Sequence, residues 1–457
     1  MRRVTSPKPR SELRELLALS VPLVAGHSGG QLMSFVDTAM IGRLGSAAIA
    51  GVGIGGGLFF AMTVIGMGTV LGMDALVAQA IGAGEHERAR KILWQGVRIA
   101  LGMSVPVMAL IALSTLLLEP IGIEVETARE TRRFLFSRLP NVIPFLVFAA
   151  ARSYLQAARG ARIVVFAMVA ANVVNLVGNY ILIYGDDSLI RIGLPGIGLP
   201  ALGVVGSGLS SSLASAFSVL VCAWGIRAIP TPEDPTRRDS DPVLRKRIMK
   251  LGVPIALQIL AEVGAFTIAS ILAGRMGRGP AAGYQIAITL ASFTFTVTLG
   301  LGAATAVRVG MAVGRGDTPA ARRVGFLALR VAMIFMSLTA IAFLAAPEAL
   351  ARILTDKLDV IAVAAPLVQI AGVFQLSDGA QVVAAGALRG AGDTRTAQRA
   401  NLVGHYLIGL PIAIGLGFGV GMGGPGLWWG LSAGLTVVAI ALTLRFHEIS
   451  KKPLERA

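Results

Sequence analysis

The chain has 457 residues, of which 54% are hydrophobic and 14% are charged. A soluble domain carries about 25% charged residues, so the composition excludes an ordinary soluble protein and indicates a membrane protein. The net charge of +16 does not indicate nucleic-acid binding, because the basic residues lie between apolar runs rather than in one patch with aromatic residues. The single cysteine, Cys222, excludes both a disulfide framework and a cysteine metal site.

Long apolar runs predict an all-α polytopic membrane protein with twelve transmembrane helices. The basic start, from Met1 to Arg10, does not read as a cleavable signal, because the first apolar run is too long for one. The expected spans are 15–42, 49–80, 92–118, 134–157, 163–184, 198–226, 249–274, 282–313, 325–346, 360–388, 400–421 and 425–445.

The basic residues between the spans predict the orientation. Segments on the same side as the N-terminus hold 27 Lys and Arg, and the opposite segments hold 10. Because basic residues gather on the cytoplasmic side, both termini are expected in the cytoplasm, with the chain in the inner (plasma) membrane.

The second half of the sequence repeats the first at a constant offset of 232 residues. Pro22 then aligns with Pro254, and Gly42-Arg43-Leu44-Gly45 aligns with Gly274-Arg275-Met276-Gly277. The repeat predicts two six-helix lobes related by a pseudo-two-fold axis along the membrane normal. The expected domains are an N-terminal lobe at 1–229, a polar, Pro-rich cytoplasmic linker at 230–247 and a C-terminal lobe at 248–457.

Four acidic residues, Asp37, Asp74, Glu262 and Asp378, lie inside apolar runs. A carboxylate within a membrane is costly unless it faces protein, water or a cation, so such residues usually mark ion or substrate paths. For Asp37, Glu262 and Asp378 we favour a transport role over a buried acid satisfied by its neighbours. Asp74 lies nearer the cytoplasmic face, and for it we favour a structural ion pair with Arg98 or Arg152.

Uncharged polar residues also fall within the apolar runs. Asn172, Asn175 and Asn179 recur at helical spacing and predict one polar stripe, as do Asn401 and His405. Gln31 and Gln285 have apolar surroundings. Two interpretations stay open for these residues, the lining of a substrate cavity and hydrogen bonds between helices.

Catalytic and metal-binding motifs are missing from the sequence. His27 and His405 have no second histidine at ligand spacing, and there is no Walker loop or acidic metal cluster. The glycine-rich stretch from Gly51 to Gly57 lies in an apolar helix and is very weak as a nucleotide loop. We expect no enzyme activity, no bound metal and no cofactor.

Several motifs carry a resemblance to a known family. They are Asp37-Thr-Ala-Met-Ile-Gly42, Leu71 to Ala83, Asn175 with Asn179-Tyr180, Glu262, Ala282 to Ala287, and Gln375 to Gly390. On these motifs the chain resembles the multidrug and toxic compound extrusion (MATE) family, and its NorM-like branch in particular, from about residue 14 to 445.

The resemblance implies a secondary active antiporter that exports lipophilic, often cationic, compounds in exchange for Na⁺ or H⁺ by alternating access. In that family the acids matching Glu262 and Asp378 are associated with cation binding in the C-terminal lobe. The acid matching Asp37 belongs, with Asn175 and Asn179, to a polar site in the N-terminal lobe. Phe374 stands where some members have tyrosine, which keeps an aromatic face but removes a hydroxyl.

Other classes of function stay open. A flippase for lipid-linked oligosaccharides or other lipids shares this superfamily fold, although a large cationic cavity would favour it and the charges within the spans are mostly acidic. A membrane-embedded enzyme would need a clustered nucleophile and base. The expected partners are small-molecule drugs or toxins, a monovalent cation and the lipid bilayer, with no nucleic acid, and the chain is expected to be a monomer.

Overall fold

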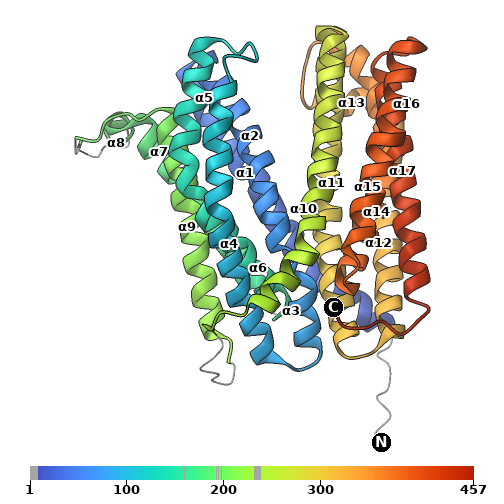
Figure 1. Ribbon diagram of the computed structural model, residues 1–457. Helices are drawn as coiled ribbons and strands as arrows, with labels where there is room; N and C mark the ends of the chain where they lie inside the picture. The colour runs from blue at the N-terminus through green and yellow to red at the C-terminus, as the bar shows by residue number, and fades with distance from the viewer. Residues whose placement is uncertain (1–8, 159, 192, 194, 197, 231–237) are drawn as a thin grey trace, which may run out of the picture. The chain divides into compact units, whose positions relative to one another are not determined.

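The computed structural model describes residues 9–158, 160–191, 193, 195–196, 198–230 and 238–457. In this part of the chain twelve helices are long and apolar enough to cross a membrane, and no β-strand occurs (Figure 1). The all-α class and the twelve spans predicted from the sequence are therefore confirmed. Much of the predicted linker, 231–237, lies outside the described residues.

The helices of the N-terminal half of the sequence begin and end as follows: α1 Pro9–Ile41, α2 Ser46–Val70, α3 Met73–Gly82, α4 His86–Ser114, α5 Val125–Arg138, α6 Val142–Ala157, α7 Ala161–Tyr184, α8 Asp186–Arg191 and α9 Val204–Ala228. In the C-terminal half they are α10 Pro242–Arg275, α11 Arg278–Gly314, α12 Thr318–Ala345, α13 Pro347–Arg352, α14 Leu358–Ala391, α15 Thr394–Leu402, α16 Leu410–Ile414 and α17 Gly424–Ile449. Short 3₁₀ turns follow α1, α4 and α5, and π-helical segments flank α16 at Val403–Gly409 and Gly415–Gly419.

Two predicted spans have different boundaries in the structure. The fourth span begins at Val125, because α5 precedes α6 in one continuous crossing, Val125–Ala157. The prediction that 119–133 forms a loop was therefore wrong for α5, whose many charged residues masked its helical pattern. The second span is interrupted between α2 and α3, at Leu71 and Gly72.

The backbone repeats with the sequence. Gly45 and Gly277, which are 232 residues apart, start α2 and α11 from nearly the same conformation, with φ of 112° and 116°. An L-residue rarely adopts this φ, so glycine is needed at both helix starts. Pro22 and Pro254, which are also paired by the offset, lie inside α1 and α10. The internal repeat is thus present in the local structure as well as in the sequence.

The described residues form two compact units. Unit 1 contains the described residues up to Val24 together with 74–84 and 257–457, and unit 2 contains 25–73 and 85–256. Helices α1 and α10 each contribute to both units, while α3 belongs to unit 1. Unit 2 contains α7 and α9, which lie side by side (Figure 1). The three-part domain division predicted from the sequence stays a prediction.

Helix α3 packs within unit 1 through glycines that allow backbones to touch. A Cβ atom added to Gly82 would lie 2.1 Å from the carbonyl oxygen of Met311 on α11. A Cβ added to Gly314 would lie 2.0 Å from the carbonyl oxygen of Gln79. The Gln79 side chain also donates to the carbonyl oxygen of Gly390 on α14 at 3.1 Å. These contacts fasten α3 to α11 and α14.

The glycine-rich stretch has a packing role in unit 2. A Cβ atom on Gly51 would lie 2.9 Å from Cβ of Glu130, and one on Gly55 would lie 2.7 Å from the Phe134 ring. The two glycines therefore let α2 approach α5 closely, as small residues do between membrane helices.

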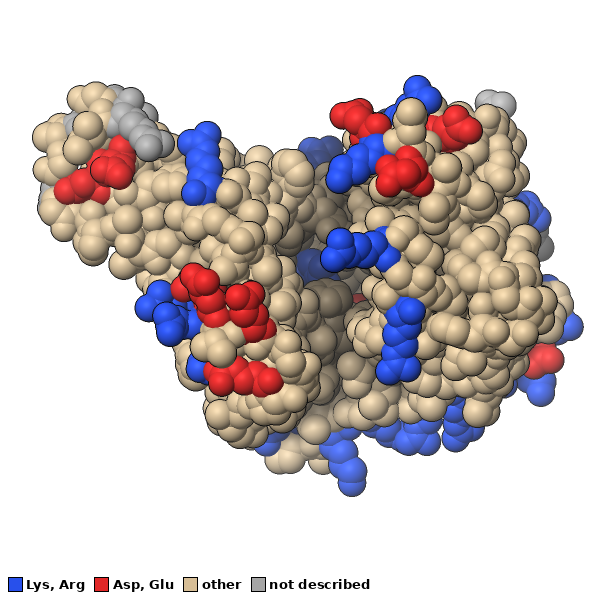
Figure 2. All heavy atoms as spheres, turned by 90° about the horizontal axis from the view of Figure 1, so that it is seen from above, with Lys and Arg blue, Asp and Glu red and all other residues tan. Residues whose placement is uncertain are grey.

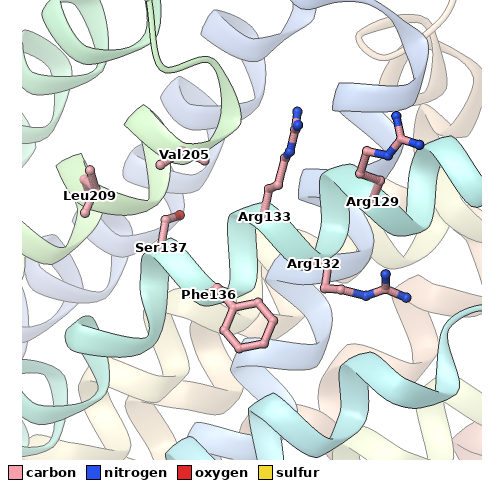
Figure 3. A pocket seen from close by; sticks show the side chains of 7 residues that line it. All are labelled: Arg129, Arg132, Arg133, Phe136, Ser137, Val205 and Leu209. Carbon is pink, nitrogen blue, oxygen red and sulfur yellow. The ribbon is translucent and has the colours of Figure 1, made fainter.

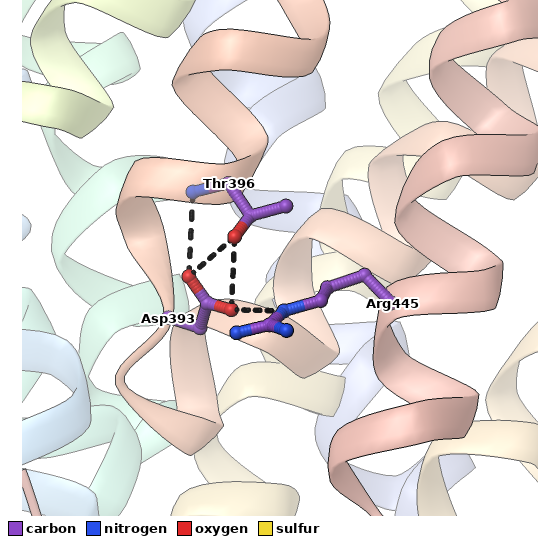
Figure 4. A network of polar contacts seen from close by, with 3 residues as sticks. All are labelled: Asp393, Thr396 and Arg445. Atoms are coloured by element: carbon purple, nitrogen blue, oxygen red, sulfur yellow. Dashed lines mark hydrogen bonds and ion pairs between the residues drawn. The ribbon is translucent and has the colours of Figure 1, made fainter.

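Charged side chains mostly serve helix ends. Asp393 begins α15: its carboxylate accepts hydrogen bonds from the backbone N–H of Thr396 at 3.3 Å and from the Thr396 hydroxyl at 2.8 Å (Figure 4). Arg445 on α17 pairs with the same carboxylate at 2.8 Å. On the face seen in Figure 2, acidic and basic side chains gather in mixed clusters with uncharged surface between them.

Candidate functional site

The first buried polar centre, the Asp37 centre, lies in unit 2 and consists of Asp37, Asn175, Asn179 and Ser211. Asn179 donates to Oδ1 of Asp37 at 2.6 Å and Asn175 donates to the same oxygen at 3.1 Å. The Ser211 hydroxyl donates to the other oxygen, Oδ2, at 3.2 Å. Asp37 is 3% exposed and both asparagines are fully buried. The structure therefore brings three predicted residues, Asp37, Asn175 and Asn179, together.

The helices explain how this centre forms. Asn175 and Asn179 are one turn apart on α7, so their side chains leave the same face. Ser211 comes from α9, whose Ser210 hydroxyl bonds to the backbone carbonyl of Asn175 at 2.8 Å and fixes the helix register. The Asn179 side chain also donates to Oδ1 of Asn175, at 3.3 Å, while its own Oδ1 is buried without a hydrogen-bond partner in the described chain.

A basic residue also lies near this centre. The guanidinium of Arg138 lies over the Phe59 ring, 4.5 Å from its centroid, and is within electrostatic reach of Asp37. No ion pair between the two is formed within 4 Å among the described residues. The Asp37 carboxylate is therefore held by neutral donors, with a positive charge farther off.

The second buried polar centre, the Glu262 centre, lies in unit 1 and consists of Glu262 on α10 with Asp378 and Gln381 on α14. The Gln381 amide donates to Oε1 of Glu262 at 3.1 Å and also interacts with Asp378. Asp378 is 4% exposed, and the two carboxylates are close enough for their charges to interact. The Oε1 atom of Gln381 is buried without a hydrogen-bond partner in the described part of the chain. The two acids predicted to act together are thus neighbours.

An aromatic cluster packs beside this centre. Phe374, one turn before Asp378, meets Phe266 edge to face at 5.9 Å and Trp428 at 5.4 Å between ring centroids. His405 is fully buried in the π-helical segment Val403–Gly409, 6.1 Å from the Phe266 ring. Neither ring nitrogen of His405 has a hydrogen-bond partner in the described chain. Phe374 and His405 therefore pack in the interior, and their predicted cavity role stays a prediction.

The other predicted residues lie apart from both centres. Gln31 and Gln285 are exposed, and Gln285 contacts only the Thr289 hydroxyl, at 3.5 Å, among the described residues. Asp74 forms its ion pair with Arg389, at 3.9 Å. The structural interpretation of Asp74 holds, but the suggested partner Arg98 donates instead to the backbone carbonyl of Arg238.

Sequence reasoning missed three residues that complete the centres. Gln381 stands three positions after Asp378, and this helical spacing is a usable signal. Ser211 lies in a run of three serines, which gives no sign of which hydroxyl meets Asp37. Arg138 was assigned to a loop because the start of α5 was missed.

Chemically, both centres offer carboxylate and amide oxygens inside membrane spans. Oxygen donors suit a proton or a hard cation rather than a soft transition metal. In the described residues no group of three or more His, Cys, Asp and Glu side chains is arranged to hold a metal ion.

A comparison with known proteins decides the family. The MatE family model matches residues 22–181 and again residues 254–414, so the two matches start 232 residues apart, as the repeat does. The chain belongs to the MatE family. Members of this family are transporters, which confirms the prediction that the chain is a multi-pass membrane transporter and not an enzyme.

Relatives and solved structures agree with this assignment. The MatE chain is 32% identical over 453 residues to a probable multidrug resistance protein NorM of Synechococcus sp., covering 97% of this chain and 95% of the relative. It is 33% identical over 440 residues to the multidrug resistance protein NorM of Burkholderia vietnamiensis, covering 94% and 92%.

Two solved structures share the fold of this MatE chain. The eukaryotic MATE transporter AtDTX14 matches with a TM-score of 0.85 at 20% identity, over 98% of this chain and 99% of that one. The Vibrio cholerae MATE transporter VcmN in its bent form matches with a TM-score of 0.82 at 19% identity, over 97% and 98%.

Proposed function

We propose that this MatE protein is a secondary active multidrug efflux antiporter, which exports lipophilic or cationic compounds in exchange for Na⁺ or H⁺. The observation that carries the proposal is the presence of two separate carboxylate–amide centres within membrane spans. Carboxylates in such positions are costly and usually serve ion or substrate paths. The substrate class is supported by the NorM relatives, which are named multidrug resistance proteins.

The proposed mechanism assigns cation coupling to Glu262, Asp378 and Asp37. Two carboxylates side by side repel each other, so a proton or Na⁺ that neutralises one of them is stabilised by the Glu262 centre. A cation that binds one conformation more tightly shifts the equilibrium toward it, and alternating access needs such a difference. The unpartnered acceptor oxygens of Asn179 and Gln381 would add ligands for the cation.

The remaining parts of the proposal follow from residue placement. Asn175, Asn179, Gln31 and Gln285 are proposed to offer polar contacts to substrate. Phe374 and His405 are proposed to support the Glu262 centre from the aromatic cluster. The protein is proposed to act as a monomer in the inner membrane with both termini in the cytoplasm, in keeping with the 27 basic residues on that side.

The test is ethidium efflux from proteoliposomes, with a pH gradient and a Na⁺ gradient imposed separately. Glu262→Gln and Asp378→Asn should each abolish gradient-driven efflux while the protein remains folded. Glu348→Gln is the matched control, because it neutralises an exposed carboxylate on α13. Full efflux by the double variant Glu262→Gln/Asp378→Asn would refute the assignment.

A flippase function predicts a different result in the same vesicles. Ethidium would then not move with either gradient, and a fluorescent lipid-linked oligosaccharide would change leaflets. The two functions are therefore separated by adding this probe to the assay.

A further inference from the structure

A groove in unit 2 lies outside both polar centres. It has a volume of about 430 Å³ and is formed by α5 and α9 (Figure 3). Its lining from α5 includes Arg129, Arg132, Arg133 and Phe136, and its lining from α9 includes Val205 and Leu209.

The groove is charged at one end and apolar at the other. Its four α5 residues follow the spacing i, i+3, i+4 and i+7, so they form one stripe along the helix. The three arginines lie toward the start of α5, and Phe136 lies about 10 Å farther along the axis than Arg129. Gly208 on α9 packs against Phe134 and Ser137, which places Leu209 level with the apolar end.

The apolar end continues along α9. Leu213, one turn after Leu209, is 56% exposed, and Leu220 is 67% exposed. Both belong to a membrane span, so this surface meets lipid chains rather than water. A long hydrocarbon chain can therefore lie along α9 and end at the arginines.

The arginines are oriented and keep free donors. Arg132 pairs with Glu119 at 2.7 Å and Arg133 pairs with Glu130 at 3.1 Å. Each guanidinium has five N–H donors, so one carboxylate contact leaves others available. Arg129 has no ion pair among the described residues. The next acid on α5, Glu126, lies a turn toward the helix start, away from Phe136.

We propose that this groove binds an anionic phospholipid, with the phosphate on Arg129, Arg132 and Arg133 and an acyl chain along Phe136, Leu209 and Leu213. Guanidinium forks match phosphate oxygens in pairs, which a single ammonium does not. Basic pockets between membrane helices with an adjoining apolar surface select anionic head groups over zwitterionic ones. The lipid comes from the leaflet at the end of the helices where α5 begins.

The test measures lipid retention by the full-length purified protein in native mass spectrometry. The probes are phosphatidylglycerol, phosphatidylcholine with the same chains, and inorganic phosphate. Wild type should retain phosphatidylglycerol preferentially. Arg129→Gln, which breaks no ion pair, should weaken retention several-fold, and Arg129→Gln/Arg133→Gln by roughly tenfold or more. Arg278→Gln, an exposed arginine at the start of α11, is the matched control and should bind as wild type does.

A second variant tests the apolar end of the groove. Phe136→Ala should weaken binding of long-chain phosphatidylglycerol and leave the dihexanoyl form unaffected. Equal retention of phosphatidylglycerol and phosphatidylcholine, competition by inorganic phosphate at equal concentration, or unchanged binding by the double arginine variant would each overturn the proposal. Since the readout is binding alone, its outcome is independent of the transport assay.

Discussion

Replacing Asp37 by asparagine should stop pH-driven efflux while leaving the protein folded. Asparagine has the same shape as aspartate and still offers one acceptor oxygen to Asn175 and Asn179, but it carries no charge and binds no proton at the relevant pH. The Glu262 centre shares no residue with the Asp37 centre, and the two lie in different compact units. Na⁺ binding at Glu262 and Asp378 should therefore survive this change.

The hydrogen bonds set the expected loss of stability. Three donors reach the Asp37 carboxylate, at 2.6, 3.1 and 3.2 Å. A hydrogen bond to a charged acceptor contributes about 1.5–3 kcal/mol and one to a neutral acceptor about 0.5–1.5 kcal/mol. Relief of the buried charge offsets part of this difference. Asp37→Asn should thus lower the free energy of unfolding by no more than about 2 kcal/mol.

Asp37→Ala provides the contrast. It leaves three buried donors without their acceptor, and each costs about 1–3 kcal/mol. This variant should melt at a clearly lower temperature than Asp37→Asn.

The assay is paired on one purified preparation of each variant. A pH-jump experiment in proteoliposomes measures efflux, and calorimetry measures Na⁺ binding. Asp187→Asn, an exposed acid on α8, is the control for loss of one negative charge. The reasoning is refuted if Asp37→Asn retains full pH-driven efflux. It is also refuted if this variant loses Na⁺ binding as completely as Glu262→Gln, because the acids would then act as one site.

Three further predictions follow from individual contacts. Gln381→Leu should weaken Na⁺ binding by roughly tenfold, because it removes the donor to Glu262 (3.1 Å) and an acceptor oxygen; calorimetry measures this, and unchanged affinity would contradict it. Gly82→Ala should destabilise the protein by about 1–3 kcal/mol in thermal unfolding, since its Cβ meets the Met311 carbonyl; Gly102→Ala, where a Cβ meets nothing within 4 Å, should be neutral or stabilising, and equal melting of the two variants would refute the packing argument. Leu244 and Lys91 hold the pKa of Asp241 below its usual value, so its stabilising effect is present above the unfolded pKa of about 3.9 and is lost as pH falls through the folded pKa. Asp241→Asn should therefore melt slightly below wild type at pH 7, with the gap closing below about pH 4; a gap that is constant with pH would exclude the charge as its cause.

The sequence predicted what depends on local pattern. Hydropathy revealed the twelve spans, and the constant offset revealed the repeat that Gly45 and Gly277 share in backbone conformation. Helical spacing placed Asn175 and Asn179 on one face of α7. The family motifs named Asp37, which the structure then brings into hydrogen-bonding distance of both.

Contacts between distant segments were beyond the reach of pattern. Asp74 was given partners close to it in sequence, whereas its ion pair is with Arg389 on α14. The reason is that α3 packs in unit 1 through glycine contacts with α11, and nothing in the composition of α3 states which helix it will meet. Ser211 was missed for the same reason, because its hydroxyl is one of three adjacent serines until α9 is placed against α7.

Helix α5 shows how one misread pattern can hide a surface. Its fourteen residues include six charged ones, so a search for apolar runs assigns them to a loop. The helix instead buries Thr127, Ala128, Thr131, Phe134 and Leu135 on one face and turns its charged side chains outward. That outward face carries the stripe of three arginines and Phe136 that forms the groove with α9. The charges that conceal the helix from hydropathy are the groups that give the groove its preference for an anionic lipid, so an amphipathic reading with a period of 3.6 residues would have found both.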